Sequence, residues 1–484
     1  MPVAFPSVLF PGSEHTRREE PREPPPCLRD LNLDQVVDAI TAGREEYDLK
    51  PFFYAPLKDA AAVQYRQQVF RDLENARLLE HIRAFARQMR SVREQLALAD
   101  KLYYRYEKER WFLDSAAAYC HAVSALGRAL DQEELSSTAL LAFREYLRQY
   151  TRSEPFLTLL AETENLQAEL RSVKYCLLIH GDRVTVRHYD SETDYSAEVE
   201  QVFAKFQQGK PRELKLSVPD GPHMNHVEAA ILNLVARLHP GTFARLDQYR
   251  LKHAGYLDDG IAAFDREMQF YLAYLEYIAP LRQAGLPFCY PAIATEDKEV
   301  HACAAFDLAL AHQRVQEHST VVGNDFYLTG PERILVVSGP NQGGKTTFAR
   351  MVGQLHYLAA LGCPVPGTQA RLFLVDHVFT HFEKEEDIRN LRGKLQDDLV
   401  RIHSILAQAT SKSLLIMNEL FTSTTSHDAL FLGRKILEQV SRLGALCVYV
   451  TFLDELASLN ETTVSMVATV APHNPAMHTY QIVR

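Results

Sequence analysis

The residues of this chain most suited to chemistry are eight in a row, 339–346, which read Gly-Pro-Asn-Gln-Gly-Gly-Lys-Thr. They match the pattern G-x-x-x-x-G-K-[ST], in which glycines let the backbone wrap a polyphosphate and the loop N–H groups point at the anion. Lys345 is expected to reach the outer phosphates, and the Thr346 hydroxyl to bind Mg²⁺. The predicted nucleotide-binding residues are Gly339, Pro340, Asn341, Gln342, Gly343, Gly344, Lys345, Thr346 and Thr347.

The segments on either side of this loop have the patterns that a phosphate loop requires. Residues 334–337 (Ile-Leu-Val-Val) form a short apolar run typical of a buried parallel strand. After the loop, apolar residues recur at helical spacing from Phe348 to Leu355. An ordinary glycine-rich turn can also contain Lys-Thr, but the strand and the helix favour a nucleoside triphosphate site, with ATP and Mg²⁺ as the expected cofactors.

A second polar group, Asn418-Glu419, follows the strand-like run 413–417 (Ser-Leu-Leu-Ile-Met). In phosphate-loop enzymes an acidic pair at this place holds Mg²⁺ through water and polarises the attacking water. We therefore expect Glu419 to be the general base and Lys345 to be the other catalytic residue. Thr346, Asn418 and Glu419 are the predicted metal residues, although an amide offers Mg²⁺ a weaker oxygen than a carboxylate does.

Residues 420–428 (Leu-Phe-Thr-Ser-Thr-Thr-Ser-His-Asp) are rich in hydroxyl groups and precede a helical pattern over 429–443. Taken alone, this segment is best explained as a loop and a helix N-cap. A third strand-like run follows at 446–452. This alternation of strands and helices predicts a nucleotide-binding α/β domain over residues 286–484.

Composition limits the class of protein. The 484 residues, 46% apolar and 24% charged, are expected to form several globular domains. No stretch approaches the roughly 20 apolar residues of a membrane-spanning helix, and the first residues do not read as a secretory signal. Seven cysteines without a C-x-x-C pair indicate neither a zinc knuckle nor a disulfide framework. A cytoplasmic protein without membrane contact is expected, and its net charge of −10 permits only a local basic face for nucleic acid.

Changes in hydrophobic period divide the remainder of the chain. From Val69 to Ala99, apolar residues recur every three or four positions and predict one long amphipathic helix. The aromatic residues between Phe264 and Tyr277 are expected to belong to a core. The predicted divisions are a flexible, proline-rich segment over 1–29, a helical region over 30–170, a β-containing insertion over 171–224, a helical return over 225–285 and the α/β domain over 286–484.

A β-hairpin is predicted within the insertion, because two strand-like runs flank His-Gly-Asp at 180–182. Arg183, Thr185 and Arg187 would share one face of its second strand, and Lys174 lies just before the first. A solvated strand face explains these residues as well as a phosphate-contacting face does. Lys174, Arg183 and Arg187 are the candidate DNA contacts.

Four motifs in order along the chain resemble the ATPase domain of the MutS family of DNA mismatch-repair proteins. They are Gly-Pro-Asn-x-Gly-Gly-Lys-Thr at 339–346, Val-Phe-Thr at 378–380, Leu-Ile-Met-Asn-Glu-Leu at 415–420 and Thr-Thr-Ser-His-Asp at 424–428. Less specifically, residues 30–285 are similar to the family's lever and clamp. The resemblance implies a multidomain fold, with an α-helical lever and core, a small β-containing clamp insertion and an α/β P-loop ATPase domain of the ABC type.

In proteins of this family two ATPase domains pair, and the hydroxyl-rich loop of one subunit completes the nucleotide site of the other. The resemblance therefore implies that Thr424, Thr425, Ser426 and Asp428 act in trans in a nucleotide-dependent homodimer. ATP binding would then couple domain closure to clamp arms around double-stranded DNA, as a population shift between open and closed forms.

The chain departs from the family's pattern in several places. No segment ahead of the lever is expected to supply the Phe-x-Glu wedge that reads mismatches, and Phe143-Arg144-Glu145 lies within a helical pattern. Asn418 replaces the family's metal-holding Asp, and Phe452 stands where a His follows the third strand. Both changes predict slow hydrolysis.

Two further departures lie in the α/β domain. Residues 383–398 keep Asp387 and Arg392, whereas Glu383, Gly393 and Lys394 replace small Gly, Ser and Thr positions of the family. The chain ends after a strand-like run at 479–483, without the helical segment that usually braces the family's dimer.

The resulting hypothesis is a MutS-like, Mg²⁺-dependent ATPase that acts as an ATP-gated clamp on duplex or branched DNA, in mismatch repair or recombination, without mismatch readout. The alternative is a nucleotide-sensing structural protein that binds ATP, hydrolyses it poorly and contacts a protein partner. An ABC- or SMC-like ATPase is disfavoured, because a Leu-Ser-Gly-Gly-type signature is absent from the sequence.

Overall fold

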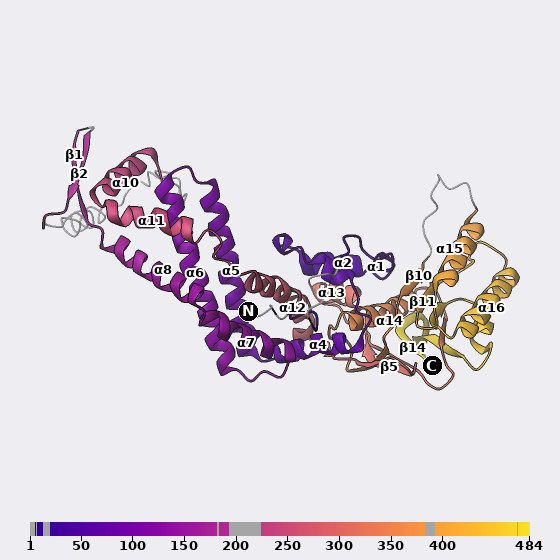
Figure 1. Ribbon diagram of the computed structural model, residues 1–484. Coiled ribbons are helices and arrows are strands. Elements are labelled where there is room, and N and C mark those ends of the chain that lie inside the picture. The colour runs from indigo at the N-terminus through magenta and orange to yellow at the C-terminus, as the bar shows by residue number, and fades with distance from the viewer. Residues whose placement is uncertain are drawn as a thin grey trace. The chain divides into compact units, whose positions relative to one another are not determined.

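The computed structural model describes residues 5, 7–12, 20–181, 183–192, 224–382, 393–471 and 473–484. The chain divides into two compact units (Figure 1). Unit 1 comprises Met1–Leu79, Glu134–Phe143 and Ala262–Arg484, and unit 2 comprises Glu80–Glu133 and Arg144–Ile261. A multidomain fold of mixed helix and sheet, as the sequence predicts, is confirmed. Among the described residues, no helix has the length and apolar character needed to cross a membrane.

The main sheet of unit 1 has six strands in the order β10-β11-β12-β7-β13-β14. All neighbouring pairs are parallel except β13 and β14. The central strands are apolar runs because helices cover both of their faces, and the three strands predicted in this domain are confirmed. The strand bounds are β7 Ile334–Ser338, β10 Val378–His381, β11 Leu414–Asn418, β12 Leu446–Val450, β13 Thr463–Ala471 and β14 Asn474–Val483.

Opposite faces of this sheet pack against different helices. On one face, Leu415 and Met417 of β11 join a buried cluster with Leu437 of helix α16 (Ser426–Leu443). On the other face, Ile416 lies against Gly353 of helix α14 (Lys345–Ala360), where an added Cβ would come within 2.5 Å of the Ile416 side chain. Because residues 339–344 connect the carboxyl end of β7 directly to α14, the amino end of α14 lies at the carboxyl edge of the sheet. Helix α15 (Lys394–Gln408) and the 3₁₀ helix η3 (Asp454–Ser458) also belong to this domain.

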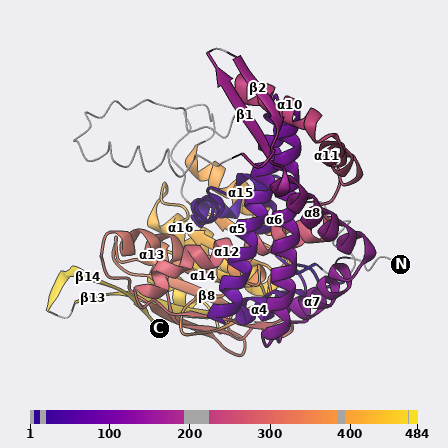
Figure 2. The same cartoon turned by 90° about the vertical axis from the view of Figure 1, so that its left-hand side faces the viewer.

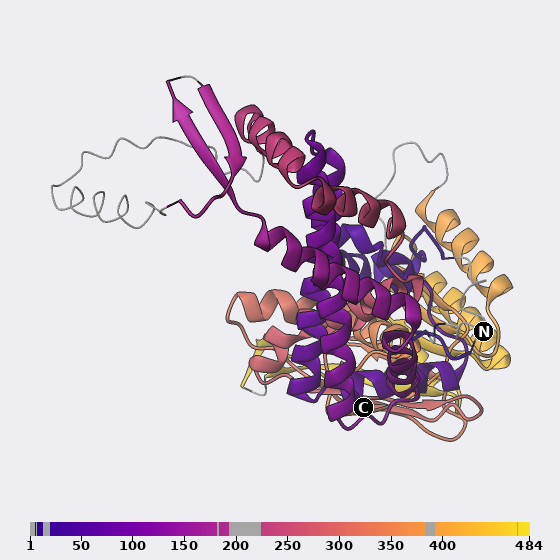
Figure 3. The same ribbon diagram turned by 60° about the vertical axis from the view of Figure 1, so that its left-hand side comes forward.

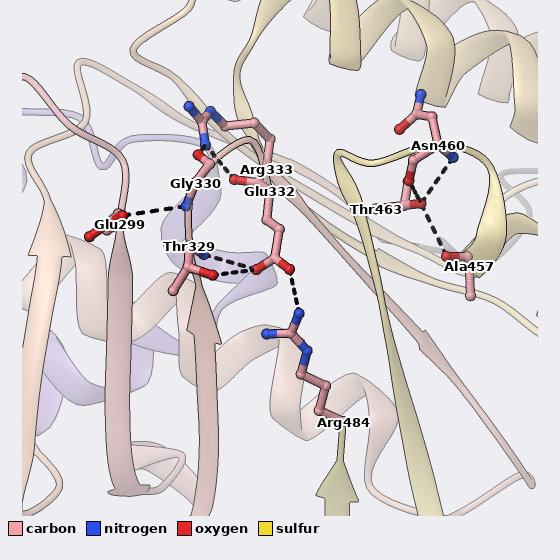
Figure 4. Close-up of polar contacts among 9 residues, drawn as sticks. All are labelled: Glu299, Thr329, Gly330, Glu332, Arg333, Ala457, Asn460, Thr463 and Arg484. Carbon is pink, nitrogen blue, oxygen red and sulfur yellow. Dashed lines mark hydrogen bonds and ion pairs between the residues drawn. The ribbon is translucent and has the colours of Figure 1, made fainter.

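Two turns set the amino ends of the neighbouring strands β7 and β13 (Figure 4). In the first, the Glu332 carboxylate accepts hydrogen bonds from the Thr329 backbone N–H (2.9 Å) and hydroxyl (3.3 Å) and pairs with the Arg484 guanidinium. In the second, the Thr463 hydroxyl donates to the carbonyl of Asn460 at 2.8 Å. These side-chain bonds define where the strand that leads into the glycine loop begins.

The other elements of unit 1 are short helices, two small sheets and the long helix α12. A four-stranded sheet has the order β4-β9-β5-β6, and β3 pairs with β8. The aromatic residues of α12 are buried in the core as predicted, including Phe264, Phe270 and Tyr274. The bounds are α1 Cys27–Asp30, α2 Leu33–Thr41, η2 Glu45–Tyr47, α3 Lys50–Tyr54, α4 Ala60–Asp72, α12 Asp259–Gln283, β3 Phe288–Cys289, β4 Ala292–Ala294, β5 Val300–Ala305, α13 Leu308–Gln316, β6 Asn324–Leu328, β8 Val365–Pro366 and β9 Gln369–Phe373.

Two local expectations differ from the structure of unit 1. The helix predicted from Val69 to Ala99 is two helices, α4 and α5 (Ala76–Lys101), because the Asn75 side chain accepts the N–H of Arg77 at 2.9 Å and starts a new helix. Within the predicted flexible segment, Val8 and Leu9 are fully buried. The Glu267 carboxylate explains this, since it accepts the Val8 N–H at 2.6 Å.

Unit 2 consists of helices and one hairpin. Helices α6 and α8 lie side by side, and strand β2 lies against α10 (Figures 2 and 3). The predicted hairpin is confirmed, with Leu178 opposite Thr185 in antiparallel register. The bounds are α6 Arg105–Gln132, α7 Thr138–Thr151, α8 Glu154–Ser172, β1 Tyr175–His180, β2 Arg183–His188, α10 His226–Leu238 and α11 Pro240–Lys252; helices α5, α7 and α12 have residues in both units.

Candidate functional site

The glycine loop connects the central strand β7 to α14 and approaches β13 closely. Gly339 has φ 120°, and an added Cβ would lie 2.9 Å from the Ala468 Cβ and 3.1 Å from the Ala468 backbone. Gly344 has φ 91° and is the N-cap position of α14. Both positions need glycine, because a side chain is strained at positive φ and at Gly339 would also meet strand β13.

Lys345, the first residue of α14, is 4% exposed. Its Nζ donates to the carbonyl oxygens of Gly339 (2.9 Å) and Pro340 (3.0 Å) and lies 4.0 Å from Glu419 Oε1. The same Nζ is 4.3 Å from the centroid of the Phe452 ring. Burial lowers the pKa of the Lys345 ammonium, and the nearby Glu419 carboxylate opposes that shift. The cation is thus held inside its own loop by two carbonyls and an aromatic face.

The Thr346 hydroxyl donates to Asn418 Oδ1 at 2.9 Å. Asn418 is buried at the carboxyl end of β11, in register with Val450 of β12. Glu419 follows in the left-handed region (φ 53°), and its backbone N–H donates to the Val450 carbonyl at 3.0 Å. Two oxygen ligands of the kind that Mg²⁺ prefers therefore lie side by side, and the donor set fits that ion.

A pocket of about 580 Å³ opens beside the loop. Residues 342–347 and Glu419 form one wall, and Tyr480 of β14 lies against the loop, since an added Cβ at Gly344 would be 3.7 Å from the Tyr480 Cα. Asn324 fixes this part of β14 by donating to the Tyr480 carbonyl at 3.2 Å and accepting the Ile482 N–H at 2.7 Å. The remaining lining residues are Asp307, Leu310, Arg314, Ser319, Thr320, Val321, Val322 and Asn324.

Sequence reasoning missed this second wall and Tyr480. Its residues lie between 32 (Asp307) and 15 (Asn324) positions before Gly339, and Tyr480 lies far beyond the loop, with no pattern that links them. The one local signal is Asp307, which accepts the N–H of Leu310 at 3.0 Å as the N-cap of α13. Burial raises the pKa of that carboxyl.

The hydroxyl-rich loop caps α16, as the local explanation predicts. Thr425 accepts the Asp428 N–H at 3.2 Å, and its hydroxyl donates to Asp428 Oδ2 at 3.0 Å. Thr424 donates to the same carboxylate oxygen at 3.4 Å. Thr424, Thr425, Ser426 and Asp428 are not among the described residues that line the pocket of their own chain.

The candidate DNA contacts lie in unit 2, next to and within the hairpin. Arg183, Thr185 and Arg187 alternate with half-buried residues and are exposed on one face of β2, as expected. Arg187 pairs with Glu192 at 2.7 Å, and the Lys174 Nζ lies 5.6 Å from the Tyr189 ring centroid. Glu192 therefore reduces the positive charge available on this face.

Two other sets of residues were singled out from the sequence, the Phe-x-Glu triplet at 143–145 and the segment 383–398. Phe143 is fully buried in α7 and stacks on Phe264 with ring centroids 3.5 Å apart, so its Phe-x-Glu triplet belongs to the core. Glu383, Asp387 and Arg392 lie outside the described residues.

Comparisons with known proteins find similarity in the carboxy-terminal α/β domain. Residues 335–482 match the family description MutS domain V. DNA mismatch repair protein MutS of Brevibacillus brevis (strain 47) is 30% identical over 152 residues, which are 31% of this chain and 18% of that protein. MutS of Caldicellulosiruptor saccharolyticus is 33% identical over 148 residues (30% and 17%), and that of Erythrobacter litoralis is 31% identical over 186 residues (38% and 21%).

Strand, glycine-rich loop and helix, set at the carboxyl edge of a parallel sheet, define the class of this domain as α/β. Over residues 335–482 this chain is similar to MutS domain V and to the MutS proteins named above. It spans about a fifth of the length of the relatives it matches.

Proposed function

We propose that this chain is an ATP-dependent, DNA-binding protein with a DNA-repair role like that of its MutS relatives, and that residues 339–347 bind the phosphates of ATP. The observation that carries the proposal is the meeting of Lys345, Thr346, Asn418 and Glu419 at one end of a pocket of about 580 Å³. The pocket is large enough for a nucleoside triphosphate, since ligand sites commonly measure about 300–1,000 Å³.

Each of these residues has a role that its position supports. The Lys345 ammonium binds phosphate oxygens after leaving the Gly339 and Pro340 carbonyls, a short displacement of a flexible side chain. Thr346 and Asn418 hold Mg²⁺ through their oxygens, and the ion supplies neutralising charge on the phosphates. Glu419 orients and deprotonates the attacking water.

Hydrolysis by a single chain is expected to be slow. Asn418 brings no negative charge to the metal, and Phe452 supplies no hydrogen-bond donor near the phosphates. Thr425, Ser426 and Asp428 are exposed and Thr424 is half-buried, and none of the four lines the pocket of its own chain. We propose that they complete the pocket of a second copy, so that ATP drives formation of a homodimer.

DNA binding is assigned to unit 2, whose hairpin carries Lys174, Arg183 and Arg187. Phosphate contacts from these residues make binding weaker as salt increases. A double charge reversal, Arg183→Glu with Arg187→Glu, is expected to weaken binding to duplex, looped and branched DNA and to flatten its salt dependence. If the variant and the wild type bind DNA with equal affinity and equal salt dependence, the hairpin is not part of the DNA interface.

A second candidate function is favoured by the Lys345–Phe452 contact and by Asn418. In this reading the chain senses ATP, hydrolyses it poorly and acts through a protein partner. Phosphate release by the wild type and by Glu419→Gln separates the two functions. Release that disappears in Glu419→Gln supports the ATPase, whereas a rate that is negligible in both supports the sensor.

The central test is calorimetry with Mg·ATP on the wild type and on Lys345→Ala. Removal of the ammonium is expected to abolish measurable binding, because it deletes the fixed cation that faces the phosphates. Lys435→Ala, on the exposed side of α16, is the matched control and should bind as the wild type does. Absence of heat with folded wild-type protein would refute nucleotide binding at this loop.

A further inference from the structure

Residues 7–9 (Ser-Val-Leu) are buried in unit 1 although they belong to no helix or strand. Ser7 is 1% exposed, and Val8 and Leu9 are fully buried. Buried backbone N–H and C=O groups need hydrogen-bond partners, and a segment without regular structure must find them elsewhere. Among the described residues, no backbone–backbone hydrogen bond reaches residues 7–9. Side chains of α4 and α12 supply the partners instead.

The donors of this segment converge on the carboxylate of Glu267, a buried residue of α12. Glu267 Oε2 accepts the N–H of Val8 at 2.6 Å and that of Leu9 at 3.3 Å. The Ser7 hydroxyl donates to the same carboxylate, with both oxygens at 2.9 Å, and accepts the N–H of Phe10 at 3.0 Å. Hydrogen bonds to an ionised acceptor are roughly twice as strong as neutral ones. The carboxylate therefore holds a hydroxyl and two successive backbone N–H groups.

The acceptors of the segment are satisfied from the same two helices. The three consecutive carbonyls of residues 7–9 accept, in order, from the Tyr65 hydroxyl (2.7 Å), the Tyr271 hydroxyl (2.6 Å) and Arg66 Nε (3.0 Å). Tyr65 and Arg66 belong to α4, and Tyr271 belongs to α12. Side chains thus read this backbone from both sides, as a binding site reads a peptide.

Arg66 also connects the segment to the carboxyl end of α14. Its Nη1 donates to the carbonyl of Leu361, the C-cap residue of α14, at 3.0 Å. The guanidinium lies 5.0 Å from the Phe10 ring centroid and 5.1 Å from that of Phe270. A cation beside the last carbonyls of a helix stabilises that end of the helix. One buried cation is therefore shared by the amino-terminal segment and the end of α14.

We propose that Tyr65, Arg66, Glu267 and Tyr271 form a peptide-binding site, and that residues 7–10 are its tethered ligand, an exchangeable strap that fixes the carboxyl end of α14. The ligand class is a short segment of Ser followed by apolar residues, recognised through its backbone and the Ser hydroxyl. Because only side chains hold the strap, it is released without breaking a helix or a sheet. The site lies at the opposite end of α14 from the glycine loop, and it does not depend on nucleotide binding.

The test supplies the strap as a separate peptide to a full chain whose own strap is displaced. Val8→Asp with Leu9→Asp displaces it, because two carboxylates do not enter an apolar site. A fluorescently labelled peptide of residues 5–12 is expected to bind this double variant saturably in an anisotropy titration. Binding to the wild type should be at least about 10-fold weaker, because the tethered strap competes at an effective concentration on the order of mM. A peptide with Ser7→Ala should bind the double variant about 10-fold more weakly.

Two glutamates of α12 give a matched pair of variants in the strap-displaced background. Glu267→Gln is expected to weaken peptide binding about 10-fold or more, because an amide oxygen is a weaker acceptor than a carboxylate. Glu276→Gln, on the exposed side of the same helix, should leave peptide binding unchanged. Equal affinity in both variants would contradict the role of Glu267.

Hydrogen exchange on the wild type keeps the test decisive if the double variant does not fold. The amides of Val8 and Leu9 are expected to exchange through local release, at least about 100-fold faster than the amides of β7. In the folded double variant, the amides of residues 359–361 should exchange faster than in the wild type and slow again when the peptide is added.

Four results would overturn the proposal. They are no saturable peptide binding to a folded double variant, equal peptide binding to the wild type, exchange of the Val8 and Leu9 amides only together with those of β7, and no response at the end of α14. A wild type that is dimeric in solution, with a monomeric double variant, would show that the strap comes from a second copy, and the intramolecular docking would then be wrong.

Discussion

Replacing Phe452 with leucine is expected to tighten nucleotide binding. In the structure the Lys345 ammonium lies 4.3 Å from the Phe452 ring centroid, and the proposed nucleotide binding requires this cation for the phosphates. Leucine retains apolar bulk but has no π-face, so the arrangement in which Lys345 faces residue 452 loses a stabilising contact that phosphate binding does not need.

The magnitude follows from the exposure of the two groups. A cation–π contact contributes about 0.5–1 kcal/mol at an exposed site and about 2 kcal/mol when desolvated. Phe452 is 46% exposed, whereas Lys345 is 4% exposed. We therefore expect about 1 kcal/mol, equivalent to a Kd about 5-fold lower for a slowly hydrolysed ATP analogue with Mg²⁺.

The assay is calorimetry on the wild type, Phe452→Leu and a matched control, Phe431→Leu. Phe431 is also exposed and lies 5.9 Å from the Lys435 Nζ, but on α16 and outside the pocket lining. The control should leave Kd unchanged. If Phe452→Leu binds the analogue as the wild type does, or more weakly, the ring does not compete with the phosphates and the reasoning is wrong.

Three further predictions concern the metal residue, the loop and unit 2. Asn418→Asp is expected to strengthen the Mg²⁺ dependence of nucleotide binding and to raise turnover, measured by phosphate release across a Mg²⁺ titration. Gly339→Ala is expected to weaken Mg·ATP binding about 10-fold or more in calorimetry, because the added Cβ would lie 2.9 Å from that of Ala468 at φ 120°. Burial and the Asp247 carboxylate raise the pKa of Glu109 from 4.5 to about 7. Since the folded-state pKa exceeds the unfolded one, this stabilisation is complete below pH 4.5 and is lost as pH rises through about 7, so Glu109→Gln should reduce the fall in Tm between pH 5 and pH 8.

Each of these predictions has a control or an outcome that would contradict it. The control for Gly339→Ala is Gly330→Ala. Gly330 also has positive φ (54°), but no atom lies within 4 Å of an added Cβ there. If both variants lose affinity equally, the contact with β13 is not the cause of the loss. If Asn418→Asp leaves the Mg²⁺ dependence of nucleotide binding unchanged, residue 418 does not bind the metal. A pH profile of Tm identical in Glu109→Gln and the wild type would show that the Glu109 carboxyl does not titrate with unfolding.

Local sequence determined much of the carboxy-terminal domain. The strands at 334–337, 413–417 and 446–452 are predictable because buried parallel strands must be apolar throughout. The glycine loop is predictable because its backbone needs φ values that only glycine adopts readily. The cap of α16 is predictable because a helix start favours a side-chain acceptor, such as the Thr425 hydroxyl, for its first N–H groups. The order of these motifs also indicated the similarity to MutS proteins, which the comparisons show over residues 335–482. Local periodicity was less reliable at the junction of α4 and α5, where Asn75 interrupts an apolar repeat that continues across it.

Tertiary structure alone decided what surrounds the motifs. Tyr480 and Asn324 come beside the loop only because β14 and the start of β6 meet there. The ring of Phe452 meets Lys345 because β12 lies next to β7 in the sheet. The cavity that His356 and Tyr357 help to line depends on the packing of α14 against distant segments. Such contacts join residues far apart in the chain, and neither the periodicity of a segment nor the chemistry of a turn encodes which distant side chain will complete them.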